Sequence, residues 1–210
     1  MIGDRRIPSY NTTPESYYLQ KYFREMVDAG LKCVVMEVSS QGLMLHRVGG
    51  FIFDYGIFTN LEPDHIGPSE HKDFADYLHA KSLLFRQCKM GIVNYDDEHM
   101  REIIKNATCE IETYGISEGA DLRAAEVDLH CSEGKLLVSY KTEGLIALPV
   151  TVGIPGKFTI YNSLTAIALC RHFDIPEKMI QEALLSVKVK GRVEPVEISK
   201  HFTLMIDYAH

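Results

Sequence analysis

The feature that most constrains the fold is an alternation of short apolar runs with amphipathic stretches. Residues 33–38, 55–59 and 90–95 are largely apolar runs of the length and texture typical of buried parallel strands. Residues 70–87 carry apolar side chains at helical spacing between two of these runs, which predicts an amphipathic helix. Because strands alternate with helices, we expect an α/β fold in which a mostly parallel sheet is flanked by helices.

Boundary residues place two more helices in the first part of the chain. Thr13 is a candidate N-cap and Pro14 suits the first helical position, so a helix is predicted over about 14–29. Gly30 is suited to end that helix. Residues 39–42 combine Ser, Gln and Gly after an apolar run, which predicts a turn into a short helix.

The later part of the chain has a different texture. Turn residues divide 109–152 into short runs, which predicts a small, mostly antiparallel β portion. Helical patterns return over about 160–173 and 177–187, and 202–206 is a final predicted strand.

Composition excludes several classes of partner. The 210 residues carry a formal net charge of −7 and no dense run of Lys and Arg, whereas nucleic acids and anionic membranes need a basic footprint. The five cysteines are odd in number and form no C-x-x-C pair, which argues against a disulfide framework or a zinc site. No apolar run reaches the roughly 18 residues of a membrane span. We therefore expect a cytoplasmic protein without nucleic-acid or membrane partners; its oligomeric state is left open.

Polar side chains follow the predicted strands or begin the helices, which is where a shared site would need them. These clusters are 37–40, 59–65, 94–97 and 207–210. Each cluster taken alone is equally well explained by hydrogen bonds in turns and caps. Glu37 is harder to explain in this way, because a carboxylate that closes an apolar strand must be paired or bound to metal to offset its desolvation.

A second group of side chains indicates a divalent cation, because His and carboxylate groups are suitable ligands. Its members are Asp64, His65, Glu70, His71, His79 and Lys81. The alternative for any single histidine is a structural role, and for the lysine a solvated amine on a buried stem. Residues 153–158 are not a phosphate-binding loop, because the glycine spacing is wrong and no Ser or Thr follows the lysine.

In order and spacing, the polar segments resemble the Mur ligase family, and within it the members that add the third amino acid to UDP-N-acetylmuramoyl-dipeptide. The resemblance covers nearly the whole chain. The segments that carry it are Asn11-Thr12-Thr13-Pro14-Glu15, Val35-Met36-Glu37-Val38-Ser39-Ser40, His46-Arg47-Val48, Phe58-Thr59-Asn60-Leu61 with Asp64-His65, Lys81, Tyr161-Asn162, Gly191-Arg192 with Glu194, and Asp207-Tyr208-Ala209-His210.

The resemblance implies an ATP-dependent amide ligase of peptidoglycan synthesis, in which ATP phosphorylates a carboxylate and an amine attacks the acyl phosphate. It implies that the UDP-N-acetylmuramoyl-dipeptide is held by Asn11, Thr12, Thr13, Ser39 and Arg47. The implied catalytic residues, which also bind Mg²⁺, are Glu37, His65 and a carbamylated Lys81. The implied contacts to adenine, phosphates and ribose of ATP are Asn162, Arg192 and Asp207. The amino acid added is meso-diaminopimelate or L-lysine.

The resemblance also implies a domain organisation. Residues 1–202 would form the middle, ATP-binding domain, and 203–210 would begin a C-terminal ligase domain. The family's glycine-rich Thr-Asn-Gly-Lys-Thr loop would precede residue 1, so we expect a fragment of a longer enzyme that is inactive alone. Thr159 stands where relatives carry Asn, and Leu45 where close relatives carry Gln. Contacts at these two positions are expected to differ.

Three alternatives remain at this point. The first is another ATP-dependent ligase of the superfamily, such as a folylpolyglutamate synthase or a different Mur ligase. The second is a metal-dependent hydrolase, which would use Asp64, His65, His71, His79 and a carbamylated Lys81. The third is a binding module that folds but catalyses nothing. Hydrolysis without ATP would identify the second.

Overall fold

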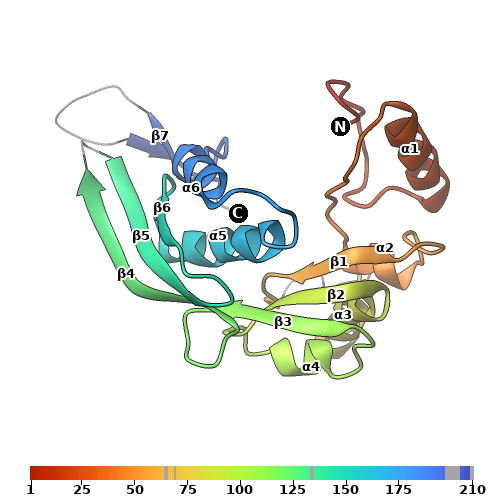
Figure 1. Cartoon of the computed structure of the whole chain (residues 1–210). Helices are drawn as coiled ribbons and strands as arrows, with labels where there is room; N and C mark the ends of the chain where they lie inside the picture. Colours follow the sequence, from red (N-terminus) through yellow and green to blue (C-terminus); the bar gives the residue numbers. More distant parts are fainter. Residues whose placement is uncertain (64–65, 69, 133–134, 197–203, 209–210) are drawn as a thin grey trace. The chain divides into compact units, whose positions relative to one another are not determined.

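A computed structural model of the chain describes residues 1–63, 66–68, 70–132, 135–196 and 204–208 (Figure 1). In chain order the elements are α1 (Ser16–Asp28), α2 (Ser40–Met44), β1 (Phe53–Phe58), α3 (Phe74–Ser82), the 3₁₀ helix η1 (Leu83–Arg86), β2 (Cys88–Asn94), α4 (Met100–Ile104), β3 (Glu110–Gly115), β4 (Leu122–Ser132), β5 (Lys135–Gly144), β6 (Pro149–Val152), α5 (Lys157–Cys170), α6 (Glu177–Ser186), β7 (Glu194–Val196) and β8 (Leu204–Ile206).

The main sheet has six strands in the order β1-β2-β3-β4-β5-β6. It is mixed and mostly parallel, with helices on its flanks, and this confirms the predicted α/β fold. β3 and β4 pair in parallel, whereas β4, β5 and β6 pair antiparallel. The antiparallel portion predicted over 109–152 is therefore present, but it continues the main sheet and is not a sheet of its own. A short second sheet pairs β7 with β8.

The chain forms two compact units. The first, here the N-terminal unit, comprises residues 1–56, 61–90 and 101–110, and the second, the C-terminal unit, comprises 57–60, 91–100 and 111–210. Each unit has apolar side chains of its own to bury, so each is described separately below.

In the N-terminal unit, α1 and α2 pack around a small core. Leu19, Leu43 and Val48 are its buried members, and Phe23 stacks edge-on against Phe51 with ring centroids 5.0 Å apart. α1 begins later than predicted: its N-cap is Glu15, and Thr13 is buried two residues before that cap. The N-cap prediction for Thr13 is wrong because its hydroxyl bonds to a distant segment instead of to the helix.

The strand predicted over 33–38 is absent, since residues 31–39 carry neither strand nor helix. A strand needs a hydrogen-bonded neighbour, and the sheet order begins at β1. Met36 and Val38 still pack against the core of α1 and α2, while Val35 is 85% exposed. The apolar run therefore anchors an extended segment through alternate side chains, and its apolar character misled the prediction.

The helix predicted over 70–87 is shorter in the structure. It begins at Phe74, because Asp73 is the N-cap and its carboxylate accepts a hydrogen bond from the Asp76 backbone amide at 2.8 Å. It then passes into η1, and the amide side chain of Gln87 donates to the backbone carbonyl of Phe51 at 2.8 Å. This side chain ties the end of η1 to the segment that precedes β1.

In the C-terminal unit, α5 and α6 pack against β4, β5 and β6 (Figure 1). Ile160, Leu164 and Ile167 line the buried face of α5 and are fully inaccessible to solvent. The helices predicted over 160–173 and 177–187 correspond to α5 and α6, with the first starting three residues earlier. The last predicted strand corresponds to β8, although its first two residues lie outside the described residues, as does the predicted domain boundary at 202/203.

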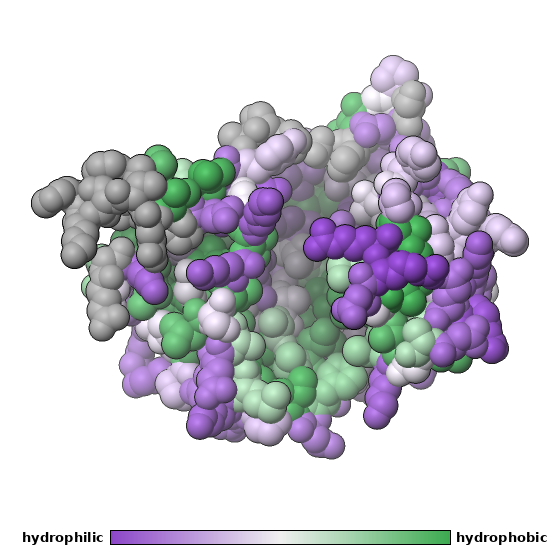
Figure 2. Space-filling view, turned by 90° about the horizontal axis from the view of Figure 1, so that it is seen from above, coloured by the Kyte–Doolittle hydropathy of each residue, from purple (hydrophilic) through white to green (hydrophobic). Residues whose placement is uncertain are grey.

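Hydrophilic and apolar side chains are intermixed on the face shown in Figure 2. Single large apolar groups, such as Tyr10 and Val35, are exposed in the N-terminal unit. Within the ranges that the structure describes, every helix is too short or too polar to cross a bilayer.

Candidate functional site

A cavity in the N-terminal unit gathers most of the predicted substrate-binding residues. Its volume is about 240 Å³, and it is lined by Tyr10, Asn11, Thr12, Ser39, Ser40, Gln41, Arg47, Glu70 and Lys81. Four of the five predicted substrate-binding residues and the predicted carbamylated lysine are in this lining. Tyr10, Ser40, Gln41 and Glu70 were not among the predicted site residues.

Thr13, the fifth predicted substrate-binding residue, lies behind the cavity wall. It is completely buried. Its hydroxyl donates to the backbone carbonyl of Glu37 at 3.1 Å and accepts from the backbone amide of Ser39 at 2.8 Å. These two bonds fasten the segment that carries Asn11 and Thr12 to the segment that carries Ser39. In this structure Thr13 therefore positions the residues predicted to bind substrate and does not line the cavity itself.

Ser39 and Gly42 form the turn at the start of α2. The Ser39 hydroxyl caps the helix by accepting from the Gly42 amide at 3.0 Å. A Cβ atom on Gly42 would lie 2.9 Å from two side-chain carbons of Thr13. Glycine is therefore needed here so that α2 can approach the buried threonine.

Arg47 is held at the cavity by oxygen atoms of Glu15 and Thr13. One guanidinium nitrogen lies 2.9 Å from the Glu15 carboxylate, and another donates to the Thr13 carbonyl at 3.4 Å. Its side chain is only 13% exposed, and its Nε atom is buried without a hydrogen-bond partner. An unpaired buried donor on a cation is costly, so the rest of the fold must offset the cost of this nitrogen.

Lys81 lies on α3 with its amine 5.7 Å from the centre of the Tyr77 ring. Burial lowers the pKa of Lys81 below its usual value, and the nearby Glu37 carboxylate partly opposes this shift. A lysine amine reacts with carbon dioxide only when it is uncharged, so a lowered pKa favours carbamylation. The direction of the shift agrees with the chemistry that the resemblance implies.

Glu37 differs from the sequence-based expectation. It is exposed and follows no strand, so the argument that its burial demands a partner is wrong. It nevertheless lies close enough to Lys81 for their charges to interact. His65 and Asp64 lie outside the described residues. Among the described side chains no three His, Cys, Asp or Glu groups converge. The two predicted metal-binding residues that the structure describes are Glu37 and Lys81.

Such a pair fits Mg²⁺ in the type of its donor atoms. Magnesium prefers oxygen ligands and is commonly bound through one or two carboxylates with water and phosphate oxygens completing the shell. The Glu37 carboxylate supplies oxygen directly, and a carbamate on Lys81 would add an anionic oxygen group. The residues present are therefore compatible with this ion.

A buried histidine that sequence reasoning assigned to a metal group has a different environment. His71 is completely buried, with Nε2 at 2.8 Å from the Ser40 hydroxyl and Nδ1 at 3.0 Å from the Asp76 carboxylate. Both ring nitrogens are occupied, which argues against the hydrolase alternative for this residue. Ser40 and His71 are separated by 31 positions, so only the fold brings them together.

The predicted ATP-contacting residues lie in the C-terminal unit. Asn162 is an exposed residue of α5. Arg192 donates to the Tyr208 carbonyl at 3.2 Å and lies 5.4 Å from the centre of its ring. Asp207 accepts from the Val193 amide at 3.2 Å. Arg192 and Asp207 therefore share the neighbourhood of the β7–β8 pair.

The polar cluster at 94–97 has the turn chemistry that was its alternative explanation. The Asp96 carboxylate accepts from the Ile116 amide at 2.6 Å and from the Tyr161 hydroxyl at 3.0 Å. Burial raises the pKa of Asp96, but its hydrogen bonds from Ile116, Ser117 and Tyr161 outweigh burial, and the pKa lies below its usual value. Burial and this carboxylate together raise the pKa of Tyr161 to about 12. Through Tyr161, the cluster thus holds the part of α5 that carries Asn162.

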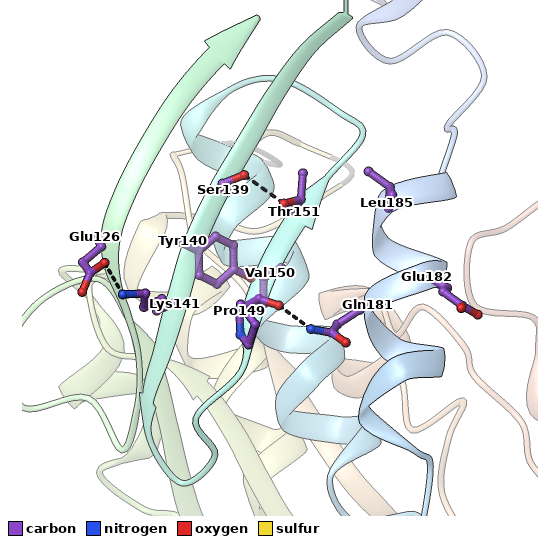
Figure 3. Close-up of a pocket in the computed structure, with 10 residues that line it drawn as sticks. All are labelled: Glu126, Ser139, Tyr140, Lys141, Pro149, Val150, Thr151, Gln181, Glu182 and Leu185. Carbon is purple, nitrogen blue, oxygen red and sulfur yellow. Dashed lines mark hydrogen bonds and ion pairs between the residues drawn. The ribbon is translucent and has the colours of Figure 1, made fainter. Parts of the chain in front are cut away.

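A second hollow, of about 470 Å³, lies in the C-terminal unit between β5, β6 and α6 (Figure 3). The Ser139 and Thr151 hydroxyls meet across the two strands at 2.9 Å, and the Gln181 amide donates to the Pro149 carbonyl at 2.8 Å. It contains none of the residues predicted for a site. The N-terminal cavity is therefore the better candidate.

Comparison with known proteins identifies the family. The model of the Mur ligase middle domain matches residues 1–170. The chain is 42% identical over 211 residues to the "UDP-N-acetylmuramoyl-L-alanyl-D-glutamate--2,6-diaminopimelate ligase" of Caldanaerobacter subterraneus subsp. tengcongensis, covering 100% of the chain and 43% of that protein. A ligase of the same name from Clostridioides difficile is 42% identical over 218 residues, covering 99% and 43%. The chain thus spans less than half the length of these relatives.

Solved structures agree on the fold. A structure of a ligase with that name aligns with a TM-score of 0.80 at 22% identity, covering 93% of this chain and 41% of the other. MurF from Acinetobacter baumannii aligns with a TM-score of 0.62 at 21% identity, covering 73% and 33%. Sequence and fold lead to the same conclusion: the chain belongs to the Mur ligase family and contains its middle domain.

Proposed function

We propose that the chain is the middle domain of an ATP-dependent ligase that joins an amino acid to UDP-N-acetylmuramoyl-L-Ala-D-Glu. The observation that carries the proposal is the cavity in which Asn11, Thr12, Ser39, Arg47 and Lys81 come together. The relatives' names support the amino acid 2,6-diaminopimelate over lysine. Residues 1–202 would constitute the middle domain, and the reaction would take place in the cytoplasm.

Arg47 would bind an anionic part of the muramoyl-dipeptide. Its fork is already oriented by Glu15 and Thr13, so little side-chain freedom is lost when the ligand arrives. Asn11, Thr12 and Ser39 would complete the contacts with amide and hydroxyl groups.

Lys81 and Glu37 would hold Mg²⁺ after carbamylation of the lysine. Bound Mg²⁺ and ATP together supply an activated phosphoryl group and neutralise charge during its transfer. The contribution of the chain is to favour the uncharged form of the Lys81 amine, which is the form that is modified, because burial disfavours its ammonium form. His65 would be a further ligand, and Asn162, Arg192 and Asp207 would contact ATP.

The proposal can be tested with the full-length enzyme that contains this chain. We expect ADP release that depends on both UDP-N-acetylmuramoyl-L-Ala-D-Glu and the amino acid. Arg47→Ala should raise the KM for the muramoyl-dipeptide about 10- to 100-fold, which corresponds to the loss of one charged hydrogen bond. Arg24→Ala is the matched control, since Arg24 pairs with the exposed Asp28 on the surface of α1.

The alternatives predict different outcomes. Release of ADP with a folate substrate, and none with the muramoyl-dipeptide, would assign the chain to a folylpolyglutamate synthase. Hydrolysis without ATP would indicate the metal-dependent hydrolase. An unchanged KM for Arg47→Ala would show that the cavity does not bind the substrate.

A further inference from the structure

Ser40, His71 and Asp76 form a continuous hydrogen-bonded chain in the N-terminal unit. Ser40 is the first residue of α2 and lines the cavity, His71 precedes α3, and Asp76 lies in the first turn of α3. The serine oxygen is 2.8 Å from Nε2 of the histidine, and the aspartate oxygen is 3.0 Å from Nδ1. The cavity wall is therefore connected to Asp76 through a buried imidazole.

The protonation states along this chain follow from its ends. An ionised carboxylate can only accept, so Nδ1 of His71 carries a proton and donates it to Asp76. In the neutral form of the imidazole, Nε2 is then bare and accepts from the Ser40 hydroxyl. With its proton directed at His71, the Ser40 oxygen has its lone pairs free for a donor in the cavity. A bound ammonium or amine would be such a donor.

The Asp76 carboxylate beside Nδ1 opposes the cost that burial imposes on an imidazolium. His71 is completely buried, whereas the Asp76 side chain is 29% exposed. The hydrogen bond from His71 holds the pKa of Asp76 below its usual value, so the carboxylate stays ionised and stabilises an imidazolium. The same arrangement of serine, histidine and aspartate activates hydroxyl groups on unrelated folds.

We propose that Ser40 is a further catalytic residue of the ligase reaction and that His71 and Asp76 position and polarise it. This inference rests on the proposed function. As the amine nitrogen bonds to the acyl carbon and the bond from that carbon to phosphate oxygen breaks, nitrogen gives a proton to Ser40 Oγ. Ser40 passes its own proton to Nε2 of His71. When the amide product leaves, the imidazolium returns its Nε2 proton to Ser40, which passes a proton to water entering the cavity, so Nδ1 keeps its hydrogen bond to Asp76.

The test compares two nucleophiles in the full-length enzyme. The amino acid arrives as an ammonium and must be deprotonated, whereas hydroxylamine is largely uncharged at neutral pH and attacks acyl phosphates without that step. Ser40→Ala removes the hydroxyl, and His71→Gln keeps an acceptor for Ser40 but cannot take up a proton. Ser139→Ala is the matched control, because that hydroxyl also bonds a side chain, Thr151, but lies outside the cavity.

We expect Ser40→Ala and His71→Gln to lower kcat for amide formation by roughly 10²- to 10⁴-fold, the range for loss of a proton acceptor. Hydroxamate formation and the KM for the muramoyl-dipeptide should stay close to those of the wild type. A purely structural role would lower both products together or raise the KM. Equal loss of amide and hydroxamate, or unchanged amide formation in both variants, overturns the inference.

Thermal melting of each variant shows whether it is folded. If Ser40→Ala fails to fold, His71→Gln and Asp76→Asn carry the same comparison. If the wild-type enzyme forms hydroxamate but the variants lose nothing, the ligase function stands and the inference fails. If the wild type forms neither product, the proposed function fails and the inference falls with it.

Discussion

Replacing Thr13 with valine should remove the hydrogen bonds that join two segments of the cavity wall, with little change in side-chain shape. Valine has nearly the volume of threonine but no hydroxyl, so the Glu37 carbonyl and the Ser39 amide both lose their partner. Thr13 is completely buried, so water has little access to replace the two lost hydrogen bonds. Each unsatisfied backbone group costs about 1 to 3 kcal/mol.

The magnitude follows from these two bonds. Both are part-buried, so the low end of the range applies to each, and we expect a loss of about 2 kcal/mol in the free energy of unfolding. For a chain of 210 residues this corresponds to a fall of roughly 4 to 8 °C in melting temperature. The KM for the muramoyl-dipeptide should rise as well, because Asn11 and Thr12 lose their attachment to Ser39.

Urea unfolding of the 210-residue chain measures the loss in free energy of unfolding, and thermal melting measures the fall in melting temperature. Thr151→Val is the control, since its hydroxyl bonds the hydroxyl of Ser139 in a part-buried position and valine suits a strand. Its free energy of unfolding should change by less than about 0.5 kcal/mol. A Thr13→Val chain as stable as the control would refute the argument that this hydroxyl fastens the two segments.

Two further substitutions test other parts of the structure. Lys81→Met should abolish ligase activity yet raise the melting temperature at neutral pH, because burial lowers the pKa of Lys81 from its usual 10.5 and the charged amine is a liability there. That advantage should shrink as the pH approaches 10.5, where the native amine has lost its proton, and an advantage independent of pH contradicts the reasoning. Gly144→Ala should cost more than about 2 kcal/mol in unfolding free energy, since φ is +88° and the added Cβ would lie 2.0 Å from the Asp121 carbonyl oxygen. Urea unfolding measures it, with wild-type stability as the contradicting result.

Elements with strong periodicity were predictable from the sequence. β1, β2, α5 and α6 lie within a few residues of their predicted bounds, because apolar spacing reflects which face is buried. The segment at 33–38 was misread, since an apolar run does not reveal whether a neighbouring strand exists to pair with it. The start of α1 was misplaced because the hydroxyl of Thr13 bonds to residues 24 and 26 positions away.

The sequence indicated which residues group together in the candidate site, but it did not indicate which of them line the cavity and which lie behind its wall. Short polar motifs grouped Asn11, Ser39 and Arg47 in one predicted site, and the structure places all three in the lining of one cavity. Nothing in those motifs indicates that Thr13 faces inward. Inward and outward orientation depends on packing between distant segments, and motif spacing carries no information about it.

The environment of His71 also could not be predicted from the sequence. Sequence reasoning grouped His71 with other potential metal ligands, because His and carboxylate groups in one stretch are chemically suited to a cation. The structure instead directs one ring nitrogen to Asp76 and the other to Ser40, which lies on another helix. A histidine with both nitrogens engaged in this way has no lone pair left for a metal, but it can still pass a proton. Residue type alone therefore left its chemistry open, and the partner at each nitrogen determines which chemistry is possible.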